Sequence, residues 1–182
     1  MIIAITGTPG IGKTSVSKIL EKNYYVIDLN QIVTDKNFII GIDKDRNSKI
    51  VDIEKLNDFI YKNYNKKDIV FVEGHLSHLL KSVDKVIILR CNPNELKKRL
   101  SMKRWNKEKI NENIEAEILD IILCETVDIH SYKNIFEIDT TKKSTIDVAL
   151  SIKDIIQSGF SNVKSYNIGN IDWSEEILKK FK

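Results

Sequence analysis

The sequence predicts an α/β fold built around a five-stranded parallel sheet with helices on both faces. Three observations support this prediction. An apolar strand pattern runs straight into the glycine-rich stretch GTPGIGKT at residues 7–14, further strand patterns alternate with helical patterns, and no linker interrupts the 182 residues. Alternating strands and helices form parallel sheets that are covered on both faces. We therefore expect a single domain over residues 1–182.

Short runs rich in β-branched and other apolar residues predict five strands, at residues 2–6, 25–29, 68–74, 85–90 and 134–139. Apolar residues at helical spacing predict helices directly after residue 14, around residues 53–60 and 96–100, and as one long helix over residues 110–122. Residues 38–52 fit no clean period and predict an irregular segment or a small insertion. The tail over residues 158–170 is loop-like, and residues 171–181 then predict a short amphipathic helix.

The composition excludes several classes of protein. A hydrophobic content of 42% argues against a disordered chain, and a formal net charge of +3 is too small to indicate nucleic-acid binding by itself. Cys91 and Cys124 stand in unrelated segments, so neither a disulfide framework nor a zinc ribbon is indicated. No stretch has the length of a membrane span, and the start MIIAIT lacks the pattern of a signal peptide. We expect a cytoplasmic protein without membrane contact.

The stretch GTPGIGKT fits the phosphate-binding P-loop pattern G-x-x-x-x-G-K-[ST] between a strand and a helix. Glycines let consecutive N–H groups turn toward phosphate oxygens, the lysine carries charge to the β and γ phosphates, and the threonine hydroxyl is a ligand for Mg²⁺. A glycine-rich turn that only joins strand to helix is the alternative. The residues expected to bind nucleotide in this loop are Gly10, Ile11, Gly12, Lys13, Thr14 and Ser15.

Glu73 closes the strand pattern IVFVE, where P-loop enzymes place the carboxylate that holds the water shell of Mg²⁺. The alternative is a glutamate that caps a helix or faces solvent. His75 and His78 follow at a spacing that, with Glu73, also permits a metal site. We favour a histidine beside the phosphates that orients water or relays a proton.

A basic cluster in LKKRLSMKRWNKEKI, residues 96–110, precedes the predicted long helix. Phosphoryl transfer needs positive charge over the migrating group, and arginine supplies a planar fork of donors, so Arg99 and Arg104 are the candidates. An ordinary solvated helix face is the alternative, and we favour it for the lysines. Trp105 is expected either to stack on a base or to cover the hinge.

Three segments together resemble one family: GTPGIGKT, then VEGH at residues 72–75, and above all KRWNKEKINENIEAEI at residues 103–118. The chain resembles the atypical adenylate kinases, also described as nuclear ATPases of small-ribosomal-subunit assembly. That family includes the coilin-interacting nuclear ATPase and archaeal adenylate-kinase-like proteins. The resemblance runs from residue 2 to about residue 155, and the third segment is its most specific part.

The resemblance implies an adenylate-kinase-like fold with a segment for the nucleoside monophosphate (NMP) over about residues 29–58, a lid over about residues 101–112 and a C-terminal extension over residues 159–182. It implies Mg²⁺-dependent transfer of the γ-phosphoryl group from ATP to AMP, with ATP hydrolysis beside it. It also implies a role in small-ribosomal-subunit biogenesis and rRNA maturation, with a small-subunit ribosomal protein as partner and only indirect contact with rRNA.

Individual residues carry the resemblance into the site. Arg104 matches the lid arginine, Glu73 the Walker B acid and His75 the histidine of a D-x-H motif, although Glu73 replaces the aspartate that the family often has. By position alone, the loop around Thr140 is expected to cradle adenine, and Arg46 is the candidate on the AMP side. Two other functions stay open: a nucleotide-switched factor that binds and releases a ribosomal protein, and another P-loop small-molecule kinase.

Overall fold

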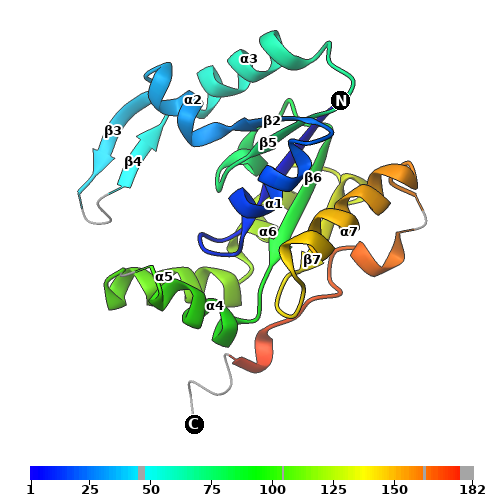
Figure 1. Cartoon of the computed structure of the whole chain (residues 1–182). Helices are drawn as coiled ribbons and strands as arrows, with labels where there is room; N and C mark the ends of the chain where they lie inside the picture. Colours follow the sequence, from blue (N-terminus) through cyan, green and yellow to red (C-terminus); the bar gives the residue numbers. More distant parts are fainter. Residues whose placement is uncertain (45–47, 104, 162, 177–182) are drawn as a thin grey trace.

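The computed structural model describes residues 1–44, 48–103, 105–161 and 163–176 (Figure 1). Its centre is a five-stranded parallel sheet in the order β2-β5-β1-β6-β7. These strands are β1 (Ile2–Thr6), β2 (Tyr25–Asp28), β5 (Val70–Glu73), β6 (Lys85–Arg90) and β7 (Ile135–Asp139). All five lie within or almost within the predicted runs, so the predicted α/β fold with a parallel sheet is confirmed.

Helices cover both faces of this sheet (Figure 1). One face carries α1 (Lys13–Leu20) and α7 (Thr145–Gln157), and the other carries α3 (Ile53–Tyr64) and α6 (Ile121–Ile129). The described residues contain three more helices: α2 (Leu29–Asp35) directly after β2, α4 (Pro93–Ser101) shortly after β6, and α5 (Lys107–Ile118), which begins within the predicted lid. The two apolar layers, one on each side of the sheet, bury β1 and β5 and nearly all of β6 and β7, which explains their unalternating apolar sequences. The edge strand β2 is only partly buried.

The parallel register brings the functional loops to one edge of the sheet. Ile5 of β1 lies opposite Glu73 of β5 and Ile87 of β6, and Asp28 of β2 lies on the other side of Glu73. The carboxyl ends of all these strands therefore meet at the same edge, and the GTPGIGKT loop leaves β1 there. Ligands of open α/β sheets bind at this edge.

Residues 38–52, predicted as an irregular segment or a small insertion, form a small insertion with regular structure, so the irregular alternative was wrong. These residues contain β3 (Ile39–Asp43) and β4 (Ser48–Val51), which pair as an antiparallel hairpin. The register shifts between Ile39 and Gly41, so the alternation of apolar and polar residues is broken and the strand period is hidden in the sequence. Ile39 and Val51 pack against the core, which anchors the base of the hairpin.

The single long helix over residues 110–122 was also wrong, because the chain turns at Asp120 between α5 and α6. Asp120 has a left-handed φ of +53°. Its carboxylate accepts a hydrogen bond from the guanidinium of Arg90, and this contact stabilises the left-handed conformation. The apolar spacing continues in phase across the break, so the sequence pattern contains no signal for it.

The sequence analysis did not predict helices α2 and α7, although capping residues precede both. Asp28 ends β2 and caps α2 by accepting hydrogen bonds from the N–H groups of Asn30, at 2.9 Å, and Gln31, at 3.3 Å. Ser144 and Asp147 form a capping box at the start of α7. Serine or aspartate before an apolar helical pattern is a readable start signal in both cases.

Three short 3-10 helices complete the fold: η1 (Ser77–Leu79), η2 (Tyr132–Asn134) and η3 (Lys164–Tyr166). After α7 the tail runs back along β7, and Asn167 forms a bridge with Phe136. The helix predicted over residues 171–181 falls partly outside the described residues. Across the described ranges, no helix combines the length and apolar character that crossing a membrane requires.

Candidate nucleotide-binding site

The GTPGIGKT loop adopts a conformation that requires glycine at two of its positions. Gly7 has a φ of +137°, and a Cβ atom there would lie 2.4 Å from the carbonyl oxygen of Leu89. Gly12 has a φ of +111° and precedes α1, so it brings no side chain to the first turn of that helix. The backbone N–H groups at the start of α1 therefore face an open space with the positive end of the helix dipole behind them, which favours an anion.

Lys13 lies under this loop rather than in solvent, with 7% of its surface exposed. Its Nζ donates hydrogen bonds to the carbonyl oxygens of Gly7, at 2.7 Å, and Thr8, at 3.2 Å. Burial lowers the pKa of Lys13 to about 8, and the negative charge of Glu73 offsets part of this effect. The side chain is therefore still largely protonated at neutral pH and is held beside the place where phosphates would bind.

Thr14 and Glu73, the two expected Mg²⁺ ligands, are neighbours. The Thr14 hydroxyl donates to Glu73 Oε1 at 3.4 Å. Burial raises the pKa of Glu73, while the charge of Lys13 acts in the opposite direction. A hydroxyl and a carboxylate beside a phosphate loop fit an ion that takes oxygen ligands and keeps several waters.

Asp28 is a second carboxylate at this point that sequence reasoning missed. It lies opposite Glu73 in the register of β2 and β5, and its charge contributes to the raised pKa of Glu73. The signal was its position at the end of the strand pattern YVID, the same position that singled out Glu73 in IVFVE.

The two histidines after β5 have different environments. His75 lines a cavity next to the phosphate loop, and partial desolvation, followed by the charge of Lys13, lowers its pKa. His78 is buried, with Nδ1 3.0 Å from the Thr6 hydroxyl and Nε2 2.8 Å from Glu125. Both nitrogens of His78 are engaged in the core. In the described part of the chain, no group of three or more His, Cys, Asp or Glu side chains is arranged to hold a metal ion.

A cavity of about 210 Å³ lies on one side of the phosphate loop. Several residues predicted for nucleotide binding line it together: Gly10, Ile11, Gly12, Ser15 and Thr140. The remaining wall comes from α7 and from Arg99. The loop around Thr140 therefore lies beside the phosphate loop, and its contact with adenine stays a prediction.

Arg99 has a different place from the one suggested by the basic cluster. Its guanidinium donates to the carbonyl oxygens of Thr140, at 3.0 Å, Thr141, at 3.2 Å, and Ile11, at 3.4 Å. These contacts tie the phosphate loop to residues 140–141. Because its donors point to these backbone carbonyls, the structure gives Arg99 a structural contact in place of the suggested role at the migrating phosphoryl group.

A second cavity, of about 600 Å³, lies on the other side of the phosphate loop. Pro9 of that loop, α2, β4 and α5 all contribute to its wall. Its polar lining includes Asn30 and Thr34 from α2 together with His75. This cavity lies between the segment predicted to bind the monophosphate and α5, a helix that begins within the predicted lid.

Trp105 contributes an aromatic wall to the larger cavity and packs against the core. Lys109 Nζ lies 4.4 Å and Lys103 Nζ 5.7 Å from the centroid of its ring, both within the range of cation–π contacts. The predicted lid arginine, Arg104, and the AMP-side candidate, Arg46, lie outside the described residues. Their roles stay predictions.

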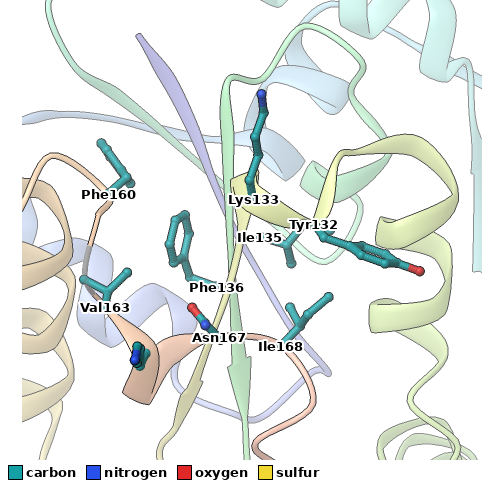
Figure 2. Close-up of a pocket in the computed structure, with 9 residues that line it drawn as sticks. Tyr132, Lys133, Ile135, Phe136, Phe160, Val163, Asn167 and Ile168 are labelled. Carbon is teal, nitrogen blue, oxygen red and sulfur yellow. The ribbon is translucent and has the colours of Figure 1, made fainter.

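A third cavity, of about 480 Å³, lies at the opposite end of the sheet, beside the amino end of β7 (Figure 2). Phe136 and Phe160 form its floor, with ring centroids 5.7 Å apart, and Lys133 stands at its rim. None of the predicted nucleotide-binding residues lines this cavity.

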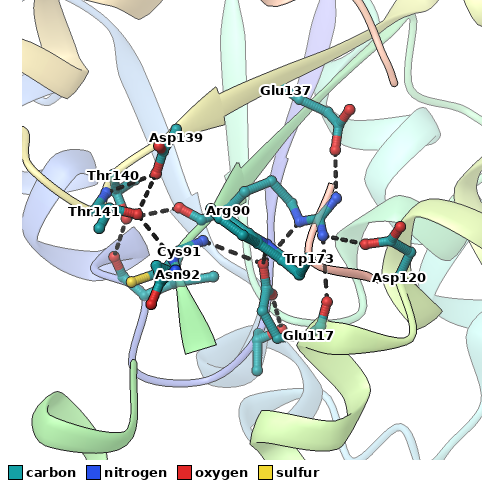
Figure 3. A network of polar contacts seen from close by, with 12 residues as sticks. Arg90, Cys91, Asn92, Glu117, Asp120, Glu137, Asp139, Thr140, Thr141 and Trp173 are labelled. Carbon is teal, nitrogen blue, oxygen red and sulfur yellow. Dashed lines mark hydrogen bonds and ion pairs between the residues drawn. The ribbon is translucent and has the colours of Figure 1, made fainter. Parts of the chain in front are cut away.

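Sequence reasoning also missed a buried polar network next to the phosphate loop (Figure 3). The guanidinium of Arg90, at the end of β6, contacts the carboxylates of Glu117, Asp120 and Glu137. Burial disfavours the charged guanidinium, but these carboxylates outweigh that effect and raise the pKa of Arg90. The C-terminal segment joins the network, since the Trp173 indole N–H donates to Glu117 at 3.3 Å.

Sequence comparisons extend over almost the whole chain. The AAA domain family model matches residues 3–120. The "Putative adenylate kinase" of Methanocaldococcus jannaschii is 39% identical over 180 residues, which cover 98% of this chain and 96% of that protein. The "Putative adenylate kinase" of Archaeoglobus fulgidus is 41% identical over 177 residues, which cover 97% of this chain and 94% of that protein.

Structural comparison gives the same fold. A shikimate kinase from Bacteroides thetaiotaomicron superposes with a TM-score of 0.59 at 17% identity, covering 86% of this chain and 98% of that chain. A shikimate kinase from Acinetobacter baumannii in complex with shikimate gives the same score and identity, covering 87% and 93%. At this identity the likeness concerns the fold alone. The archaeal relatives are 39% and 41% identical to this chain over almost its whole length, and the chain therefore belongs to the family of archaeal proteins named "Putative adenylate kinase".

Proposed function

We propose that this protein is an adenylate kinase that transfers the γ-phosphoryl group of ATP to AMP with the help of Mg²⁺. The observation that carries the proposal is the pair of cavities on opposite sides of the phosphate loop. A simple NTPase needs one nucleotide cavity, whereas a kinase that joins two nucleotides needs a second one for the acceptor. The names of the archaeal relatives support the same reaction.

The residues have separate roles in this proposal. Lys13 and the N–H groups before α1 hold the triphosphate, while Thr14 and Glu73 hold Mg²⁺, Glu73 through water. The adenine of ATP occupies the 210 Å³ cavity beside Thr140, and AMP occupies the 600 Å³ cavity beside His75. Catalysis then comes from positioning the two nucleotides in line and from neutralising charge, as in other phosphoryl transfers.

The test is ADP formation from MgATP, measured with and without AMP. We expect rapid formation of two ADP for each ATP consumed when AMP is present, and slow release of phosphate without it. A rate of ATP consumption that AMP leaves unchanged would contradict the kinase reaction. It would support an ATPase.

A role in small-ribosomal-subunit assembly is a separate proposal that rests on the sequence resemblance alone. It predicts that a purified small-subunit ribosomal protein binds this chain and that MgATP changes the affinity. Binding assays with and without MgATP test it. A cytoplasmic location belongs to the same proposal.

Glu73→Gln is expected to raise the Mg²⁺ concentration needed for half-maximal activity. A neutral amide orients metal-bound water less well than a carboxylate. The glutamine side chain has the same length, so the hydroxyl of Thr14 keeps a polar group at a similar distance. The fold is expected to survive, because burial already disfavours the charge of Glu73. Activity is measured over a Mg²⁺ titration, with Glu54→Gln in the first turn of α3 as control. An unchanged titration for Glu73→Gln would assign this residue a structural role only.

The affinity for MgATP is expected to fall as the pH rises above about 8, because burial lowers the pKa of Lys13 to about 8 in the free protein. Phosphate charges favour the protonated lysine, so its pKa rises on binding and a proton is taken up above that pH. Each further pH unit then lowers the association constant by about tenfold. Calorimetry in two buffers with different ionisation enthalpies measures this uptake, and binding without uptake at high pH would contradict it.

A further inference from the structure

Glu117, on α5, holds four separate parts of the chain together although it is outside the cavities described above (Figure 3). Its Oε2 accepts a hydrogen bond from the Thr8 hydroxyl at 2.6 Å. Its Oε1 accepts from Arg90 Nε at 2.8 Å, from the backbone N–H of Cys91 at 3.2 Å and from the Trp173 indole at 3.3 Å. Only 3% of the residue is exposed, so water does not compete for these contacts.

The bond to Thr8 connects this network to the phosphate loop. Thr8 is 2% exposed, and its carbonyl oxygen accepts one of the two hydrogen bonds that hold the Lys13 ammonium group. The residue whose side chain is fixed by Glu117 therefore also presents a backbone acceptor to Lys13. A hydrogen bond from a hydroxyl to a carboxylate is stronger than one between neutral groups, so it restrains the loop firmly.

We propose that Glu117 is a positioning residue that sets the conformation of the phosphate loop through Thr8 and thereby places the Lys13 ammonium group for the nucleotide phosphates. Glu117 itself does not touch the nucleotide. The inference rests on the proposed function only in that the loop binds MgATP. Glu117 lies near the C-terminal end of α5, a helix that begins within the predicted lid, so the same contact also ties α5 to the phosphate loop.

A purely structural role makes a different prediction. In that role Glu117 would only neutralise the buried guanidinium of Arg90, which Asp120 and Glu137 also contact. Weakening it would then lower stability but leave the loop and its nucleotide affinity unchanged. A change at Thr8 distinguishes the two roles, because the Thr8 hydroxyl is hydrogen-bonded to Glu117 and not to Arg90.

The experiment is a double-mutant cycle with Thr8→Val, Glu117→Gln and the double variant, read as Kd for MgATP and as kcat/KM for ADP formation. We expect each single variant to lose about tenfold in both, the scale of one hydrogen bond to a charged group. We expect the double variant to lose no more affinity than the single variant with the larger loss, because both changes act on the same contact. Thr8→Ser keeps the hydroxyl and is expected to retain wild-type affinity.

Asp120→Asn is the matched control, since it makes the same carboxylate-to-amide change on Arg90 without touching Thr8. Asparagine tolerates the left-handed φ of this position, so the turn is kept. We expect a lower Tm for Asp120→Asn with Kd unchanged.

Additive losses in the cycle, or a loss in Kd for Asp120→Asn equal to that of Glu117→Gln, would overturn the inference. If Glu117→Gln fails to fold, the comparison of Thr8→Val with Thr8→Ser still decides, because wild-type Kd in the valine variant overturns it. If the unaltered protein shows no AMP-dependent ADP formation, the proposed kinase reaction fails, while the cycle in Kd still tests the role of Glu117.

Discussion

Lys13→Met is expected to reduce phosphoryl transfer by more than about a hundredfold, the scale of removing one preorganised electrostatic group. The Lys13 ammonium group is buried at the phosphate loop and hydrogen-bonded to the carbonyl oxygens of Gly7 and Thr8. Methionine keeps the unbranched apolar stem but removes the charge that would neutralise the β and γ phosphates. Steady-state kcat and the Kd for MgATP measure the loss.

The fold of Lys13→Met is expected to persist, because burial disfavours the charged lysine and the Glu73 carboxylate that loses this neighbouring charge keeps its hydrogen bond from Thr14. Lys18→Met is the matched control, since Lys18 is exposed in the last turn of the same helix. We expect wild-type kinetics for this control. A folded Lys13→Met variant with near wild-type kcat would show that the loop is not the ATP site.

Arg90→Met is expected to lower the free energy of unfolding by about 3–5 kcal/mol at neutral pH, the cost of leaving a buried ion network without its partner. The Arg90 side chain is 3% exposed and contacts the carboxylates of Glu117, Asp120 and Glu137. Among the described residues no other positively charged side chain contacts all three carboxylates, so their mutual repulsion would be uncompensated in the variant. Urea denaturation measures the change, with Lys98→Met as a control at an exposed ion pair, where we expect about 0.5 kcal/mol or less.

The loss in Arg90→Met is expected to shrink at low pH. Burial raises the pKa of Asp120 and Glu137 even with the arginine present, and removing Arg90 takes away the charge that opposes this effect. Carboxyl groups with a raised pKa in the folded state are protonated there before they are in the unfolded state, so stability relative to wild type rises as pH falls through the raised values. A loss that is the same at about pH 5 and about pH 8 would contradict this account.

Much of the fold and part of the site could be predicted from the sequence, because the signals are local. The strand at residues 2–6, the GTPGIGKT loop and the helix after it are adjacent in the chain, and their residue types are dictated by burial and by phosphate geometry. Glu73 was found by the same reasoning, since it ends a buried strand whose neighbours in a parallel sheet end at the same edge.

The hairpin over residues 38–52 and the break at Asp120 could not be predicted in this way. A register shift hides the period of β3, and the apolar pattern continues unchanged from α5 into α6. In both places the conformation depends on contacts with distant residues, namely the core packing of Ile39 and the bond between Asp120 and Arg90. The intrinsic helix and strand propensities of these residues do not depend on such distant partners, so they could not predict the conformation.

The sequence by itself therefore determined the parallel α/β fold, the phosphate loop with Lys13 and the acidic strand end at Glu73. Only the tertiary structure decided that Arg99 contacts the backbone of residues 140–141, that His78 is buried, and that Glu117 bonds to Thr8. The physical reason is separation along the chain. Arg90 meets its three carboxylates from 27, 30 and 47 residues away, and nothing in the sequence distinguishes Arg90 from the exposed residues among the 29 lysines and arginines.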